Sequence, residues 1–378
     1  MGGFFDASLK IRQLARGGVD VCFRLGHRDA APARPGLVLV RGALRSGVGY
    51  RFVAYPRHCS PALRRWPHSG ARKPHRLGTM TPQPPVNPVN PENPDEGHGG
   101  RWADLDRPPL NATALRKALV RDGSLWTSLD VVQATGSTNT DLAVRAAKGE
   151  AAAGSVLVAE EQSAGRGRLD RQWSAPPRSG LFFSVHLKPE VPTERWGWLP
   201  LLAGVATATA LSRAAGVDTA LKWPNDLLLT VDGEERKAGG ILAEAAAGGV
   251  VLGIGLNVSL RADELPVPGA GSLALAGAKG TDRDPLLRAV LRSLEQWYGD
   301  WQAAGGDPAA CGLQEAYAAG CATLGRRVRA LLPGDREIRG EAVALDGDGR
   351  LVLATADGVQ LPVAAGDIVH LRPAADEG

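Results

Sequence analysis

The residues best suited to chemistry lie in a short glycine- and arginine-rich segment, Glu160–Trp173, which directly follows an apolar run. Gly165 and Gly167 give the backbone the freedom to bring a ligand against the main chain. Arg166 and Arg168 are permanently charged, forked donors that match phosphate and carboxylate groups. The segment therefore predicts a loop that binds an anion. Taken alone, it is better explained as a solvated basic turn.

Four further motifs surround this loop at spacings that one domain can bring together. They are Gly136-Ser137-Thr138-Asn139 upstream, and Lys222-Trp223-Pro224-Asn225-Asp226, Arg236-Lys237-Ala238-Gly239-Gly240-Ile241-Leu242 and Gly253-Ile254-Gly255-Leu256-Asn257 downstream. With the arginine loop, they resemble the catalytic domain of biotin protein ligases, in the order of that family and over roughly 125–259. A weaker likeness continues to the C-terminus.

The resemblance implies an enzyme that activates biotin with ATP as biotinyl-5′-adenylate. It would then transfer biotin to one lysine on the biotin carboxyl carrier domain of a biotin-dependent carboxylase. Activation is needed because a carboxylate is a poor electrophile and an amine of pKa about 10.4 is mostly protonated at neutral pH. Lys237 matches the family's catalytic lysine and would bridge the biotin carboxylate and the α-phosphate. Arg166 and Arg168 would hold the phosphate and close the loop over it.

The other site residues follow from the same resemblance. Biotin would contact Ser137, Thr138, Asn139, Gln162, Gly165, Gly167, Gly240 and Leu242, beside Arg166, Arg168 and Lys237. ATP would contact Asn225, Asn257 and the loop arginines, with Trp173 stacking on adenine. Asp226 would be catalytic and would bind Mg²⁺, which prefers oxygen ligands and keeps substrate phosphates around it. Where the family commonly has Leu-Ala after the catalytic lysine, this chain has Ala238-Gly239, so the pocket width or hairpin stiffness would differ.

Periodicity predicts the elements that position these residues. The sequence predicts helices after a cap at Asn111, after a cap at Thr138 or Asn139, and over 198–215, 284–301 and 313–321. It predicts strands over 129–132, 155–159, 180–187, 219–223, 227–229, 237–244 and 250–258, with a hairpin turn at Asp232-Gly233. The pattern indicates an α+β domain over 108–322, with a mixed, mainly antiparallel sheet packed by helices, similar to class II synthetase-like ligases. Five short strands within 323–373 suit a small barrel that resembles the family's C-terminal SH3-like domain.

The excess of basic residues is confined to the start of the chain. The net charge is +4, yet residues 1–79 hold 15 of the 44 Lys and Arg residues and 3 of the 40 acids. This leader shows no sustained period of 3.6 or 2, so a basic nucleic-acid-binding arm, a targeting peptide and untranslated upstream sequence are the alternatives. We favour the last, with translation from Met80 and a disordered Pro-rich tail over 80–107.

Composition also limits the cellular setting. No run approaches the roughly 20 apolar residues of a membrane span. The four cysteines form no CxxC pair, which argues against a zinc site or disulfide framework and suits the cytoplasm. A homodimer is left open.

Two rival functions remain. A lipoate or octanoate ligase shares the fold and also acylates a lysine, and pocket shape separates it chemically from a biotin ligase. A biotin-responsive DNA-binding repressor would need a patterned helix-turn-helix, for which the Pro-rich segment before Leu110 is unsuited, so we expect no nucleic-acid partner.

Overall fold

The computed structural model describes residues 7–13, 19–25, 106–169, 171–332, 336–364 and 366–371, and the chain divides into units Met1–Val89 and Asn90–Gly378. In the first unit, strand β1 (Ala7–Gln13) pairs antiparallel with β2 (Val19–Leu25). Apolar residues alternate with others through both segments, so the prediction that the leader lacks a period of 2 was wrong there. The predicted Pro-rich tail, up to residue 105, lies outside the described residues.

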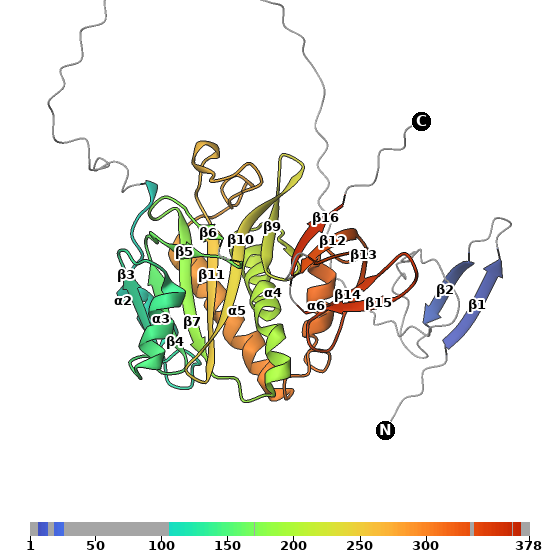
Figure 1. The fold of residues 1–378 in the computed structure, drawn as a ribbon, viewed down its shortest axis with the longest axis horizontal. Helices are drawn as coiled ribbons and strands as arrows, with labels where there is room; N and C mark the ends of the chain where they lie inside the picture. Colours follow the sequence, from blue (N-terminus) through green and yellow to red (C-terminus); the bar gives the residue numbers. More distant parts are fainter. Residues whose placement is uncertain are drawn as a thin grey trace, which may run out of the picture. The chain divides into compact units, whose positions relative to one another are not determined.

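The second unit is built on a seven-stranded sheet in the order β3-β4-β7-β11-β10-β9-β8 (Figure 1). Its strands are β3 (Ser128–Val132), β4 (Ser155–Ala159), β7 (Gly180–Leu187), β8 (Ala220–Lys222), β9 (Asp226–Val231), β10 (Glu234–Ala246) and β11 (Gly249–Asn257). Strands β3 and β4 pair in parallel, and every other neighbouring pair is antiparallel. The predicted mixed, mainly antiparallel sheet is confirmed.

Helices cover both faces of this sheet. They are α2 (Ala112–Leu119), α3 (Thr138–Ala147), α4 (Trp198–Ala214), α5 (Arg283–Ala303) and α6 (Leu313–Gly320). Val156 and Val158 of β4 join the main core that includes α4 and α5. Leu157, between them, packs in a second cluster with Leu142 of α3. Because successive strand residues point to opposite faces, α3 lies on one face of the sheet and α4 and α5 on the other.

One hairpin turn and one helix cap form as the sequence predicts. Asp232 and Gly233 join β9 to β10 with φ of 51° and 81°, the left-handed pair that a tight hairpin requires. Asn111 caps α2, because its side chain accepts a hydrogen bond from the Ala114 amide at 3.0 Å. The predicted cap of α3 was wrong: Ser137 occupies the N-cap position, without a side-chain capping bond.

A second, five-stranded antiparallel sheet follows α6, in the order β15-β14-β13-β12-β16. Its strands are β12 (Arg327–Leu332), β13 (Arg336–Leu345), β14 (Leu351–Ala354), β15 (Gln360–Val363) and β16 (Asp367–His370). All five predicted strands are present, while closure into a barrel stays a prediction.

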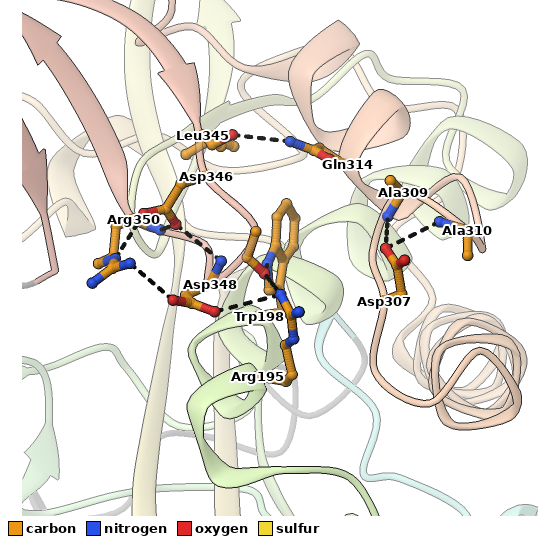
Figure 2. A network of polar contacts seen from close by, with 11 residues as sticks. Arg195, Trp198, Asp307, Ala309, Ala310, Gln314, Leu345, Asp346, Asp348 and Arg350 are labelled. Carbon is orange, nitrogen blue, oxygen red and sulfur yellow. Dashed lines mark hydrogen bonds and ion pairs between the residues drawn. The ribbon is translucent and has the colours of Figure 1, made fainter. Parts of the chain in front are cut away.

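The turn between β13 and β14 docks on the start of α4 (Figure 2). The Gly347 carbonyl accepts hydrogen bonds from Arg195 at 2.6 Å and from the Trp198 indole at 2.9 Å. The Gly349 carbonyl accepts a third bond, from the Trp223 indole, at 3.0 Å. These bonds hold the C-terminal sheet against the start of α4 and the end of β8. Among the described residues, no helix combines the length and apolar character needed to cross a membrane.

Candidate active site

The site begins as a hollow in the face of the sheet that carries α3. On β11, Ile254 and Leu256 point into the main core, which leaves Gly253 and Gly255 on the opposite face. Ser184 on β7 is the register partner of Gly253, so a third small residue lies beside them. The two glycines line a cavity of 470 Å³, and Ser184 contacts the Thr138 and Asn139 side chains beside it.

One end of the cavity is a polar cluster at the N-terminus of α3. Gln162 Oε1 accepts hydrogen bonds from the Thr138 amide at 2.8 Å and the Thr138 hydroxyl at 3.1 Å. Ser184 Oγ lies 2.7 Å from Thr138 Oγ1 and 2.6 Å from Asn139 Oδ1. Asn139 also donates to the Leu242 carbonyl at 3.2 Å. The Thr138 and Asn139 side chains make these hydrogen bonds to Gln162, Ser184 and Leu242, so neither of them caps the helix.

A β-bulge brings Lys237 into the cavity. The pairing of β10 with β9 shifts register between Lys237, which is opposite Leu228, and Gly239, so Ala238 has no partner on β9. The Lys237 backbone also bonds to residues 269 and 271 of a loop. The bulge changes the phase of the strand, so that Lys237 and Gly240 share the cavity face. Lys237 Nζ lies 2.5 Å from Asp226 Oδ1 and 5.8 Å from the centre of the Trp173 ring. The ammonium is therefore held by one carboxylate at the cavity wall.

The arginine-rich loop also lines the cavity and contains a small hairpin of β5 (Gly165–Arg166) and β6 (Gln172–Trp173). Arg166 pairs with Glu244 at 2.9 Å, and Arg171 pairs with Asp367 of the C-terminal sheet.

Arg168 donates to Asn225 Oδ1 at 3.4 Å. Burial lowers the pKa of the Arg168 guanidinium, which Asp367 and Asp226 partly oppose. Arg168 still carries its charge at neutral pH. The loop thus presents partly desolvated cations, paired mainly with groups that an incoming anion can replace.

Trp173 lies across the glycine floor of the hollow. A Cβ at Gly255 would come within 3.0 Å of its indole ring, and one at Gly240 within 3.3 Å, so both glycines leave room for the ring. Nearby, Asn257 Oδ1 is buried without a hydrogen-bond partner, while its amide nitrogen donates to the Gly271 carbonyl at 2.9 Å. An unpaired buried acceptor lining a cavity suits a ligand donor.

The structure brings together every predicted site residue except Gly165 at this one cavity. A Cβ at Gly165 would lie 2.4 Å from the Trp173 carbonyl, so this glycine allows β5 and β6 to approach each other. Sequence analysis missed Ser184, Glu244, Arg171 and Asp367. Ser184 gave a signal, since it is a small polar residue inside an otherwise apolar strand. The other three gave none, because their partners are distant in the chain.

Known families match the two parts of the chain that carry these features. Residues 131–260 match the model of the Biotin/lipoate A/B protein ligase family, and residues 323–371 match that of the Biotin protein ligase C terminal domain.

Individual proteins match along most of the same region. A biotin--[acetyl-CoA-carboxylase] ligase of Mycobacterium tuberculosis is 44% identical over 270 residues, which cover 70% of this chain and 97% of the relative. The bifunctional ligase/repressor BirA of Bacillus subtilis is 34% identical over 239 residues, covering 61% of this chain and 70% of that protein.

A solved structure agrees with these matches. The biotin protein ligase from Aquifex aeolicus in complex with biotin and ATP superposes with a TM-score of 0.54 at 27% identity, covering 66% of this chain and all of the other. Fold and site thus define an α+β ligase of the biotin and lipoate class. The chain belongs to the biotin protein ligase family.

Proposed function

We propose that this protein joins biotin to ATP as biotinyl-5′-adenylate, releasing pyrophosphate, and then transfers biotin to a lysine of a biotin carboxyl carrier domain. The observation that carries the proposal is the composition of the cavity. One end is a cluster of hydrogen-bonding side chains around Thr138, and the other holds the cations Lys237 and Arg168. Biotin has the matching pair of ends, a polar ureido ring and a carboxylate.

The polar end supports biotin over lipoate. Thr138, Asn139, Gln162 and Ser184 hydrogen-bond to one another across a buried surface. A ureido carbonyl and its two N–H groups can join this network. The dithiolane ring of lipoate and the tail of octanoate offer no such donors and acceptors, so neither gains these hydrogen bonds, which contribute about 0.5–1.5 kcal/mol each. The network therefore selects against both alternatives.

The charged end supports adenylation. The biotin carboxylate must approach the α-phosphate of ATP, and the two anions repel each other. Lys237 and Arg168 line the cavity where these groups would meet, and fixed cations stabilise the charge that builds up as the new bond forms. The carboxylate oxygen bonds to the α-phosphorus, and pyrophosphate leaves.

Asp226, Asn225 and Asn257 provide side-chain oxygens that fit Mg²⁺. Within the described residues, no three acidic, histidine or cysteine side chains gather around one point. A Mg²⁺ ion would thus rely on Asp226 together with phosphate oxygens and water, which is how this ion is commonly held. Bound there, it would neutralise charge on the phosphates of ATP. Asn257 Oδ1, which is buried without a partner, is available to it or to one of its waters.

In the second step, the carrier lysine attacks the biotin carbonyl and AMP leaves. The cavity must exclude water until then, because the adenylate is a reactive mixed anhydride. The arginine-rich loop forms one wall, and residues 266–270 form another. Cytoplasmic location, a homodimer and the lack of a nucleic-acid partner stay predictions of the sequence.

The test is to incubate the full chain with ATP, Mg²⁺, labelled biotin and a purified carrier domain. We expect one biotin to be attached for each carrier, dependent on ATP, and no attachment to a carrier whose acceptor lysine is replaced. An excess of unlabelled biotin should compete, and lipoate and octanoate should not. If an excess of lipoate or octanoate reduced the attachment of labelled biotin, the polar end of the cavity would not be the ureido-binding site that we propose.

A further inference from the structure

A buried ion pair outside the cavity connects the two ends of the arginine-rich loop. Arg283, the first residue of α5, donates to Glu160 at 2.6 Å, and the exposed fractions of the two side chains are 5% and 2%. The same guanidinium nitrogen donates to the Gly180 carbonyl at 3.3 Å. Glu160 directly follows β4 and Gly180 begins β7, so the two residues mark where the chain leaves the sheet before the arginine-rich loop and where it re-enters the sheet after it. One side chain of α5 therefore holds both ends of the segment that carries Gln162, the loop arginines and Trp173.

The backbone closes the loop at the same place. The Arg178 amide donates to the Glu160 carbonyl at 2.8 Å, so the loop returns to the residue from which it left. The loop ends are thus fixed by buried contacts of Glu160 and Arg283, neither of which lines the cavity.

The pair also connects to the second wall of the cavity. Arg283 donates to the Pro108 carbonyl at 2.6 Å, and Glu160 accepts from the Leu110 amide at 2.6 Å. The segment from Arg107 to Leu110 continues this connection, because Arg107 donates to the Ser259 carbonyl at 2.9 Å and pairs with Glu264. Residues 259 and 264 lead into the loop whose residues 266, 267 and 270 line the cavity.

We propose that Glu160 and Arg283 are positioning residues whose role is to retain the adenylate. The buried pair, with the segment 107–110, holds the arginine-rich loop and the 259–270 loop in the mutual arrangement that closes the cavity. Neither residue lines the cavity, so formation of the adenylate depends on them less than its retention does. This proposal rests on the proposed function.

The physical reason lies in the burial of the pair. Removing one member leaves an uncompensated buried charge, which lowers stability. It also breaks hydrogen bonds that join the loop ends to α5 and to residues 107–110, and this loss lets the loop ends open locally. Local opening at this point frees both loop ends. A simple loss of stability would instead affect the whole domain. Local opening and a general loss of stability therefore make different predictions. If the loop ends open locally, retention of the adenylate is lost even in a variant whose melting temperature recovers.

The experiment compares three variants of the full chain: Glu160→Gln, the double variant Glu160→Gln/Arg283→Met, and Leu291→Ala as a control. Leu291 is buried on the same helix and contacts neither loop end through a polar group, so its truncation lowers stability alone. Each protein is loaded with ATP and labelled biotin without a carrier. The adenylate that stays bound and the labelling of serum albumin are then followed over time, well below the melting temperature.

We expect Glu160→Gln to shorten the bound lifetime of the adenylate on the order of tenfold, as loss of one charge-assisted hydrogen bond predicts. The double variant removes both charges, so its melting temperature should recover toward that of the native chain while its leakage persists. Leu291→Ala should melt lower and retain the adenylate.

Two results would overturn the proposal: retention that recovers with stability in the double variant, or leakage from Leu291→Ala equal to that of Glu160→Gln. Failure of the native chain to form any adenylate would instead refute the proposed function, so the two failures are distinguishable.

Discussion

Replacing Lys237 by alanine should reduce the rate of adenylate formation far more than the affinity for biotin. The ammonium lies 2.5 Å from Asp226, so one carboxylate already offsets its charge. Lys237 stabilises the reacting groups most when the biotin carboxylate and the α-phosphate come together, because their combined negative charge then exceeds that of Asp226. Biotin alone brings a single charge and gains less.

The magnitude follows from the geometry. A cation about 4 Å from an anion contributes about 4 kcal/mol at the effective dielectric constant of 20 that suits partly exposed sites. Part of this is offset by the lost contact with Asp226, and removing one fixed stabiliser of this kind typically costs about 10² to 10³ in rate. We therefore expect a loss of rate within that range.

The assay is single-turnover adenylation, followed as pyrophosphate release, with biotin affinity measured separately by calorimetry. Lys188→Ala is the matched control, since it removes the same charge from an exposed position at the end of β7, away from the cavity. The control should adenylate at the native rate. An unchanged rate in Lys237→Ala, or a loss of biotin affinity as large as the loss of rate, would refute this account of Lys237.

Three further predictions test the other charged groups. Arg168→Gly should still form adenylate but release it, so that serum albumin becomes biotinylated in the same mixture; unlabelled albumin with normal carrier labelling would contradict this. Asp226→Asn should raise the Mg²⁺ concentration that gives half-maximal adenylation on the order of tenfold, because the sole carboxylate proposed for the ion is lost; an unchanged Mg²⁺ titration would remove Asp226 from the metal site. Burial lowers the pKa of His370 from 6.5 to about 4, so the unfolded chain takes up this proton at a higher pH than the folded one. The free energy of unfolding should fall as the pH is lowered from 6.5 toward 4, by about 1–2 kcal/mol after allowance for partial exposure, and His370→Gln should lack this part of the fall in a denaturant titration.

The sequence predicted most of the site because five motifs, in one order along the chain, resemble the biotin protein ligases, and it predicted the elements that carry these motifs from local signatures. Asp232-Gly233 marks the hairpin that carries Lys237, and the alternation through Gly253 and Asn257 marks a strand with a bare face. Turns and strand alternation depend on neighbours in the chain, so a single sequence contains them. The antiparallel sheet follows from the same signals.

What the sequence could not provide are contacts between side chains far apart in the chain. Arg171 meets Asp367 across 196 positions, and Glu160 meets Arg283 across 123. No periodicity relates such partners. From the sequence alone, a buried glutamate cannot be distinguished from an exposed one unless its arginine partner is identified. The wrong cap at α3 has a related cause: Thr138 has the residue type of a cap, but its hydroxyl is taken by Gln162 and Ser184.

The burial of these ion pairs indicates how the loop can both open and close. At its tip, the side chains of Arg166 and Arg171 are 47% and 60% exposed, and exposed pairs of this kind contribute only about 0–1 kcal/mol each. At its base, the Glu160–Arg283 pair is almost completely buried, and losing one partner there is far more costly. Substrate phosphates and carboxylates can thus displace the acids at the tip at little cost, while the base keeps the loop in register. A loop that is weakly held where it meets the ligand and firmly held where it leaves the sheet can admit substrates and still return to the same closed arrangement.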